Sequence, residues 1–139
     1  MLQFIEKKYI LSLIAITTFF IIGNSCSKDA GEGGDSSING KVWVKDYNST
    51  FTVLEGEYAG IDEDVYIIYG NDLGYGDKTK TNYNGSYEFK YLRPGKYTIY
   101  VFSKDSTLQT VSGKVSVVKE VEITKKKQKV EAPEITIFN

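Results

Sequence analysis

Apolar and polar side chains alternate from Thr81 to Asp105, which is the pattern of β-strands with one buried face. Aromatic residues alternate with charged ones between Tyr87 and Tyr91, and the alternation resumes between Tyr97 and Val101. Asn84-Gly85 and Arg93-Pro94-Gly95 separate these runs with residues that favour tight turns. The stretch therefore predicts a strand, a hairpin turn, a second strand, another tight turn and a third strand.

Further runs of the same kind occur on both sides of this stretch. They are Ile38–Lys45, Val65–Tyr69, Val115–Thr124 with a bulge at Val118–Lys119, and Val130–Phe138. The long connection from Asp46 to Asp64 could add a short edge strand near Thr50–Leu54. Roughly seven short strands with turn signals between them predict an all-β fold, an antiparallel β-sandwich.

The motif residues of this region carry a family resemblance. They are a Thr-rich strand, a turn ending in Gly, an aromatic-x-Phe strand and a Leu-x-Pro-Gly-x-Tyr segment: Thr81, Gly85, Tyr87, Phe89, Leu92, Pro94, Gly95, Tyr97, Ile99 and Val101. This arrangement resembles the carboxypeptidase regulatory-like, transthyretin-like β-sandwich over about residues 38–137. The resemblance implies a Greek-key sandwich, and it implies little about function because the motif residues form turns and core.

The N-terminus has the three parts of an export signal. Lys7 and Lys8 precede a short apolar run, Ile10–Ile22, and the small residues Gly23–Ser25 lead directly to Cys26. The arrangement resembles a Bacteroidetes-type lipoprotein signal, which implies that residues 1–25 are removed and that Cys26 carries the acyl chains. The alternative is an ordinary signal peptide with an incidental cysteine. The resemblance implies a lipid-anchored protein of the outer membrane that faces the cell surface or the periplasm.

The segment after Cys26 is small, polar and acidic. Ser27–Ser37 offers nothing to bury, so residues 26–37 are predicted to form a flexible tether. The folded domain is expected to occupy residues 38–139.

Two absences restrict the chemistry. The chain has no histidine and one cysteine, which excludes Ser-His-Asp and Cys-His catalysis, His-ligated zinc and an intrachain disulfide. The transthyretin-like fold includes a hydroxyisourate hydrolase that relies on histidines, so that activity is excluded too. We therefore expect a protein that is not an enzyme and that needs no cofactor. The net charge of −1 provides no basic field for nucleic acid.

Two groups of side chains are candidates for binding. Strict alternation places Trp43 among lysines, away from the main core, and the following connection could cover it with aromatic residues. Trp43, Tyr47, Phe51 and Tyr58 therefore form the predicted binding surface, with a satellite hydrophobic cluster as the alternative. Asp62, Asp64, Asp72 and Asp77 are weak candidates for a Ca²⁺ site, with a solvated acidic loop as the alternative.

Three functions remain open. The first is a non-catalytic, lipid-anchored envelope module that binds a protein partner or a glycan. The second is a structural subunit of a surface assembly such as a pilus, in which sandwich strands are exchanged between subunits. The third is a carboxylate-based hydrolase, which would need Asp62, Glu63, Asp64, Asp72 and Asp77 to meet in one cleft.

Overall fold

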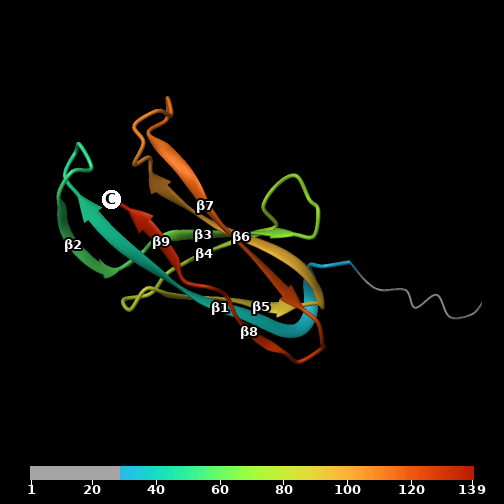
Figure 1. Cartoon of the computed structure of the whole chain (residues 1–139). Helices are drawn as coiled ribbons and strands as arrows, with labels where there is room; N and C mark the ends of the chain where they lie inside the picture. Colours follow the sequence, from blue (N-terminus) through green and yellow to red (C-terminus); the bar gives the residue numbers. More distant parts are fainter. Residues whose placement is uncertain (1–28) are drawn as a thin grey trace, which may run out of the picture.

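The computed structural model describes residues 29–139, which form a β-sandwich of two sheets (Figure 1). The first sheet is built on the long strand β1 (Glu32–Tyr47) with β2 (Leu54–Ala59), β5 (Ser86–Leu92), β8 (Lys129–Glu131) and β9 (Ile135–Phe138). The second sheet has the order β4 (Asp77–Lys80), β3 (Asp64–Tyr69), β6 (Gly95–Lys104), β7 (Lys114–Ile123). The predicted all-β sandwich is confirmed. Cys26 and the predicted signal peptide lie outside the described residues.

Strand β1 organises the first sheet because different strands pair with its two halves. Along one edge, β5 pairs with the first half and β2 with the second half, both antiparallel. Val42 marks the change: its N–H donates to the carbonyl of Gly85, and its carbonyl accepts from the N–H of Gly60, each at 2.9 Å. Along the other edge, β8 and then β9 run parallel to β1. The expectation of a purely antiparallel sandwich is therefore wrong at this edge, where the chain arrives from β7 of the other sheet.

Alternation along the strands builds the core. Val42 and Val44 of β1 and Val65 and Ile67 of β3 belong to the same core cluster, and all four side chains are almost completely buried. The remaining large core residues are Ile38, Tyr87, Phe89, Leu92, Tyr97, Ile99, Val101, Val121, Ile123, Ile135 and Ile137. Burial of aliphatic and aromatic side chains at alternate positions therefore holds the two sheets together.

The turns predicted between residues 81 and 105 exist, but they do not close hairpins. At the first turn the N–H of Gly85 donates to the carbonyl of Asn82 at 3.0 Å, and Gly85 has φ +78°. However, β4 pairs with β3, β5 pairs with β1, and β6 returns to the second sheet. Both turns therefore carry the chain from one sheet to the other. Alternation shows which side of a strand is apolar, but it does not show to which sheet the strand belongs.

Tyr91 departs from the expected apolar face of β5. Its backbone has φ +59° and its side chain is 71% exposed, whereas the next residue, Leu92, is buried. The register of β1 and β5 shifts at this point, where Leu92 is opposite both Glu32 and Ser36. The irregular pairing turns Tyr91 outward and gives its place in the core to Leu92.

Other strand boundaries differ from the prediction. Residues 29–139 form nine strands, because the expected last strand is divided into β8 and β9 around Ala132–Glu134. The register of β6 and β7 is unbroken from Gly95↔Ile123 to Lys104↔Lys114, so the predicted bulge at Val118–Lys119 is absent. Instead of bulging, β7 keeps strict alternation and places Lys119 on the inner side, opposite Ile99.

The folded region begins before Ile38. Residues 32–37 belong to β1, and Ser36 and Ser37 are buried. The N–H of Ser37 donates to the carbonyl of Gln128 at 2.9 Å, and the hydroxyl of Ser36 donates to the carbonyl of Lys125 at 3.2 Å. Small polar residues can therefore form an inner strand segment where their backbone and hydroxyl groups find partners. Residues 29–139 contain no helix long and apolar enough to cross a membrane.

Candidate functional site

The outer side of the second sheet carries a row of apolar and aromatic side chains across β3, β6 and β7, and a lysine of β4 continues the row. Val65 and Ile67 point into the core, so Tyr66 between them points outward. In the register of the sheet Tyr66 lies between Lys78 of β4 and Tyr100 of β6, and Tyr100 is opposite Val118 of β7. Strand pairing therefore aligns residues as far apart in the chain as Tyr66 and Val118.

Four aromatic rings meet on this surface, which we call the aromatic face: Tyr66, Tyr75, Tyr100 and Phe102. The Tyr66 and Tyr100 rings are stacked, with centroids 4.9 Å apart and planes 9° apart. Phe102 packs edge-to-face with both, at 5.7 and 5.6 Å, and Tyr75 from the β3–β4 turn packs against Tyr66 at 5.1 Å. Tyr75 is 57% exposed and Phe102 46%. The aromatic face is thus a preformed cluster that remains open to solvent.

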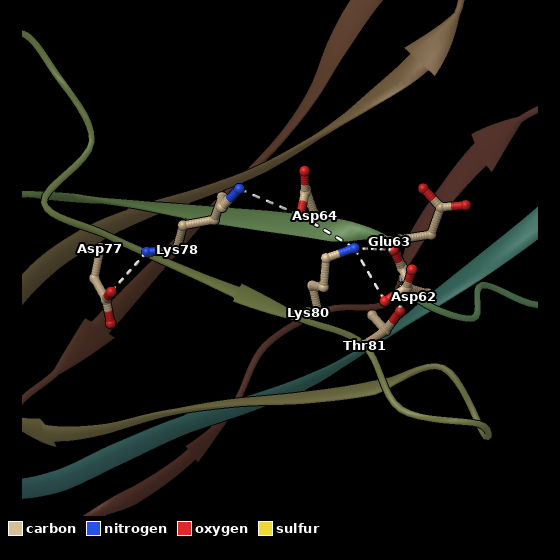
Figure 2. Close-up of polar contacts among 7 residues, drawn as sticks. All are labelled: Asp62, Glu63, Asp64, Asp77, Lys78, Lys80 and Thr81. Carbon is tan, nitrogen blue, oxygen red and sulfur yellow. Dashed lines mark hydrogen bonds and ion pairs between the residues drawn. The ribbon is translucent and has the colours of Figure 1, made fainter.

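A ladder of acidic and basic side chains borders the aromatic face (Figure 2). The Lys80 ammonium lies 3.0 Å from Asp62 Oδ1 and 3.8 Å from Asp64 Oδ1, and the Lys78 ammonium lies 3.5 Å from Asp64 Oδ1. The hydrogen bond with Asp62 raises the pKa of Lys80. Lys78 also lies 5.8 Å from the centroid of the Tyr66 ring, within reach of a cation–π interaction. The lysines therefore balance these two aspartates and extend the face with polar groups.

Glu63 supplies a carboxylate that these lysines do not pair with. Its backbone is fixed by Thr81, whose hydroxyl accepts from the Glu63 N–H at 2.8 Å and whose N–H donates to the Glu63 carbonyl at 3.0 Å. Figure 2 shows its carboxylate directed away from Lys80. Partial burial, and then the neighbouring Asp64 carboxylate, raise the pKa of Glu63. The group is a hydrogen-bond acceptor beside the aromatic face.

A hollow of about 220 Å³ connects Glu63 with the aromatic face. Its lining consists of Asp62, Glu63, Asp64, Tyr66, Val101, Phe102 and Lys114. Apolar ring surface, carboxylate acceptors and an ammonium donor thus adjoin in one depression. This combination suits a ligand that has both apolar surface and hydroxyl or amide groups.

The aspartates suggested for Ca²⁺ do not gather around one point. Asp62 and Asp64 form the ion pairs with lysine described above, Asp77 accepts the N–H of Lys78 at 2.7 Å, and Asp72 is exposed in the β3–β4 turn. Within the described part of the chain no group of three or more His, Cys, Asp or Glu side chains is arranged to hold a metal ion. Of the two predictions for these aspartates, the structure shows the solvated acidic groups, with Asp62 and Asp64 paired with lysines.

The predicted surface of Trp43, Tyr47, Phe51 and Tyr58 divides into separate parts. Tyr47 and Phe51 pack together, with ring centroids 5.8 Å apart, and Phe138 of β9 contacts both. The Trp43 indole N–H donates to Glu57 Oε2 at 3.4 Å on the outer side of the first sheet. Tyr58 is opposite the core residue Val44, which places it on the other side of that sheet.

Sequence reasoning missed the aromatic face. Tyr66 lies in a nearly continuous apolar run, VYIIY, in which no alternation marks an outer side. The available signal was that Tyr100 and Phe102 alternate with the core residues Ile99 and Val101. Two aromatic residues at alternate positions on the outer side of one strand indicate a surface cluster only when the neighbouring strand is known.

Comparison with known proteins adds little to this description. No protein-family model matches the chain, and no curated protein matches it. Among solved structures the chain is similar to one from Pseudomonas aeruginosa that is described as a "putative carbohydrate binding protein". The identity is 13%, the match covers 83% of this chain and 93% of the other, and the TM-score is 0.43. A similarity of this degree carries no argument about function.

Proposed function

We propose that this protein is a non-catalytic module of the bacterial cell envelope that binds a glycan through the aromatic face. The single observation that carries the proposal is the contiguous cluster of Tyr66, Tyr75, Tyr100 and Phe102 on an exposed sheet surface. Sheet strands hold these side chains in place before a ligand arrives, so little conformational entropy is lost on binding.

A glycan fits the chemistry of this surface. The C–H faces of a sugar ring are apolar and pack against aromatic side chains, while its hydroxyls need acceptors and donors. Glu63 and Lys114 in the adjoining hollow provide both kinds of partner next to Tyr66 and Phe102. A protein partner is the second candidate, because exposed apolar patches also mark protein interfaces. The close mixture of rings and charged groups favours the glycan.

The same proposal includes the location of the protein in the cell. The signal-like sequence before Cys26 supports acylation of that cysteine, attachment to the outer membrane, and exposure at the cell surface or in the periplasm. The turn and core motifs support membership of the carboxypeptidase regulatory-like group. A lipid-anchored module with an aromatic face would hold a polysaccharide close to the membrane.

Binding to a glycan array, followed by calorimetry with the best ligand, tests the proposal. Tyr100→Ala and Phe102→Ala should each weaken binding about tenfold or more, because each removes ring surface worth about 1.4 kcal/mol or more. Trp43→Ala, on the other sheet, is the matched control and should bind normally. Thermal melting of every variant separates loss of binding from loss of the fold.

Two results would contradict glycan binding at this surface. One is a glycan whose affinity falls with Trp43→Ala and not with the variants of the aromatic face. The other is an array without any ligand, together with cross-linking in cells that joins one envelope protein to the aromatic face. The second result would establish the protein-partner alternative.

A further inference from the structure

The turn between β7 and β8 concentrates positive charge. Lys125, Lys126, Lys127 and Lys129 follow one another closely, and all four side chains are exposed. None of the four takes part in an ion pair among residues 29–139. We call these residues the lysine turn. Neighbouring ammonium groups repel one another, so other contacts must hold this turn in shape.

Hydrogen bonds to the start of β1 fix the backbone of the lysine turn. Ser36 Oγ accepts the Gln128 N–H at 3.1 Å and donates to the Lys125 carbonyl at 3.2 Å. Asp35 Oδ1 accepts the Lys127 N–H at 3.0 Å, and Gln128 Oε1 accepts the Lys125 N–H at 3.1 Å. The lysines make these contacts through their backbone, so the contacts leave the ammonium groups free. The turn therefore presents its charges on a fixed support.

Lys127 contributes its charge at a position where the fold favours another residue. Its backbone has φ +56°, a region that lysine rarely adopts and glycine adopts without strain. Its side chain is exposed and adds to the repulsion within the turn. A glycine would therefore suit this backbone better, and the lysine side chain is not needed to form the turn.

The lysine turn lies at the end of the sandwich where the described chain begins (Figure 1). Ala30 packs so closely on Gly95 that a side-chain carbon at Gly95 would come within 2.7 Å of the Ala30 Cβ. Gly95 is opposite Ile123 in the register of β6 and β7, and Ile123 directly precedes the turn. An acyl group on Cys26 would therefore attach close to the lysine turn.

The acidic groups around the lysine turn do not cancel its charge. The Asp35 carboxylate lies directly beside the turn and offsets one of the four lysines. Glu122 flanks the turn on β7, but Lys96 is opposite Glu122 in the register of β6 and β7. Glu131 flanks it on β8 and lines the same surface hollow as Lys41. The turn itself therefore keeps an excess of positive charge.

An anionic lipid surface fits a basic turn in this place. Lysines close to a membrane are attracted to anionic head groups, and the attraction increases with each lysine. A single acyl chain binds a membrane only marginally, and a basic patch beside it supplies a second contact that makes the attachment stable. An acidic polysaccharide would also match the charge, but it would not require the charge to lie beside the lipid anchor. The position of the turn therefore favours the membrane.

We propose that the lysine turn binds the phosphate groups of anionic lipids in the membrane that holds the protein. This inference rests on the proposed attachment at Cys26 and is independent of glycan binding at the aromatic face. Strands β1 and β6 both start at this end of the sandwich. Contact of the turn with lipid would therefore direct the loops that follow β1 and β6 away from the membrane.

Sedimentation with lipid vesicles tests the proposal on the chain from residue 26 with Cys26→Ser, so that no acyl chain contributes. Vesicles of phosphatidylcholine and phosphatidylglycerol in equal parts should bind the protein at least tenfold more tightly than phosphatidylcholine alone. Lys125→Gln with Lys126→Gln should lower this binding at least tenfold, because each lysine contributes a factor of about five. Lys41→Gln with Lys104→Gln is the control, since it removes the same charge from exposed lysines outside the turn.

Salt dependence and a single variant separate charge from fold. Salt at about 1 M, where the Debye length is about 3 Å, should abolish binding to the vesicles. Lys127→Gly accepts φ +56°, so its melting temperature should equal or exceed that of the wild type while its binding falls about threefold to fivefold. Leu108→Gly is the matched control, because Leu108 also has φ +56° but is uncharged and lies in the β6–β7 loop.

Two soluble competitors identify the anion that the turn binds. Glycerol phosphate should not displace the vesicles at an equal phosphate concentration, because one phosphate group reaches only part of the turn. Polygalacturonate tests the acidic polysaccharide. Tighter binding to polygalacturonate than to the vesicles at equal charge, or unchanged vesicle binding in the Lys125→Gln and Lys126→Gln variant, overturns the proposal.

The three parts of the protein's proposed role can fail separately. Mass spectrometry of the full chain after export tests acylation of Cys26, whereas the vesicle experiment needs no acyl group. Tyr100→Ala should bind the vesicles like the wild type, so failure of glycan binding leaves this result unaffected. Loss of vesicle binding in Tyr100→Ala would place the lipid contact on the aromatic face and would contradict the assignment to the lysine turn.

Discussion

Tyr97 connects the start of the described chain to the body of the sandwich. Its hydroxyl accepts from the Gly31 N–H at 3.0 Å and donates to the Arg93 carbonyl at 2.6 Å, while its ring is buried in the core. Tyr97→Phe retains the ring and leaves these buried backbone groups without their partner. We expect the free energy of unfolding to fall by about 1–3 kcal/mol. Urea denaturation measures this change, and Tyr75→Phe, which alters an exposed hydroxyl, should show almost none.

Asp105 makes the stability of the loop between β6 and β7 depend on pH. The hydrogen bonds from Thr107 and from the N–H of Thr110 hold the pKa of this carboxyl well below its ordinary value of 3.8. Because the folded-state pKa is the lower one, the stabilisation is complete above the unfolded pKa and is lost as the pH falls below about 4. Asp105→Ala should therefore be less stable than the wild type at pH 6, and the difference should narrow at pH 3. Melting curves at both pH values give the answer, and a constant difference would refute this explanation.

At the scale of elements, β7 is an edge strand of the second sheet, and a lysine on its inner side protects it from pairing with a further strand. In residues 29–139 it pairs only with β6. Lys119 stands on its inner side between Val117 and Val121, and an inward-pointing charge discourages a second strand from pairing there. Lys119→Val should produce concentration-dependent association that sedimentation velocity detects. Lys96→Val is the control, because β6 is paired along both edges.

The outcome of this experiment also bears on a role in strand-exchanging surface assemblies. If the wild type already associates through β7 and Lys119→Val does not increase association, the lysine is no barrier. The edge could then accept a strand from another subunit. A monomeric wild type that associates only after the substitution would instead indicate that β7 is built to remain unpaired.

Alternation in the sequence predicted where the strands lie, but it did not predict which strands pair with each other. The runs around Tyr87–Tyr91 and Tyr97–Val101 are strands, and the turns between them are present. The pattern fixes only which side of a strand is buried, so it could not show that β4, β5 and β6 alternate between sheets. For the same reason Tyr66 and Tyr100 could not be placed side by side. Their contact depends on the pairing of β3 with β6, which no local signal encodes.

The loops between β1 and β2 and between β6 and β7 show the same limit in another form. Tyr47 and Phe51 lie close in the sequence, and their association was predictable. Leu108 was not, because its position depends on a loop whose conformation is set by the side chain of Asp105 and on a backbone region that sequence propensity disfavours for leucine. Sites built from strained loops are therefore the part of this molecule least accessible to sequence reasoning.

At the scale of the whole molecule, the segment before Ile38 is part of the fold. Besides the contacts of Tyr97, the Arg93 N–H donates to the Gly31 carbonyl at 2.9 Å, and the Gln128 N–H donates to Ser36 Oγ at 3.1 Å. If Cys26 is acylated, only residues 27–29 separate the anchor from Ala30, which packs against the core. They reach at most about 15 Å, compared with about 35–40 Å for residues 27–37. The anchored sandwich would then stay close to the membrane surface.

A truncation shows whether residues 29–37 are part of the fold or act as a flexible tether. A protein that begins at Ile38 should melt at least 15 °C below one that begins at Asp29, because it loses several buried hydrogen bonds. Each kcal/mol corresponds to about 4–8 °C in a domain of this size. Equal melting temperatures would mean that residues 29–37 act as a tether despite their contacts. A large difference would mean that residues 29–37 are part of the fold, so a lipid anchor at Cys26 would pull directly on the strand with which β2, β5, β8 and β9 all pair.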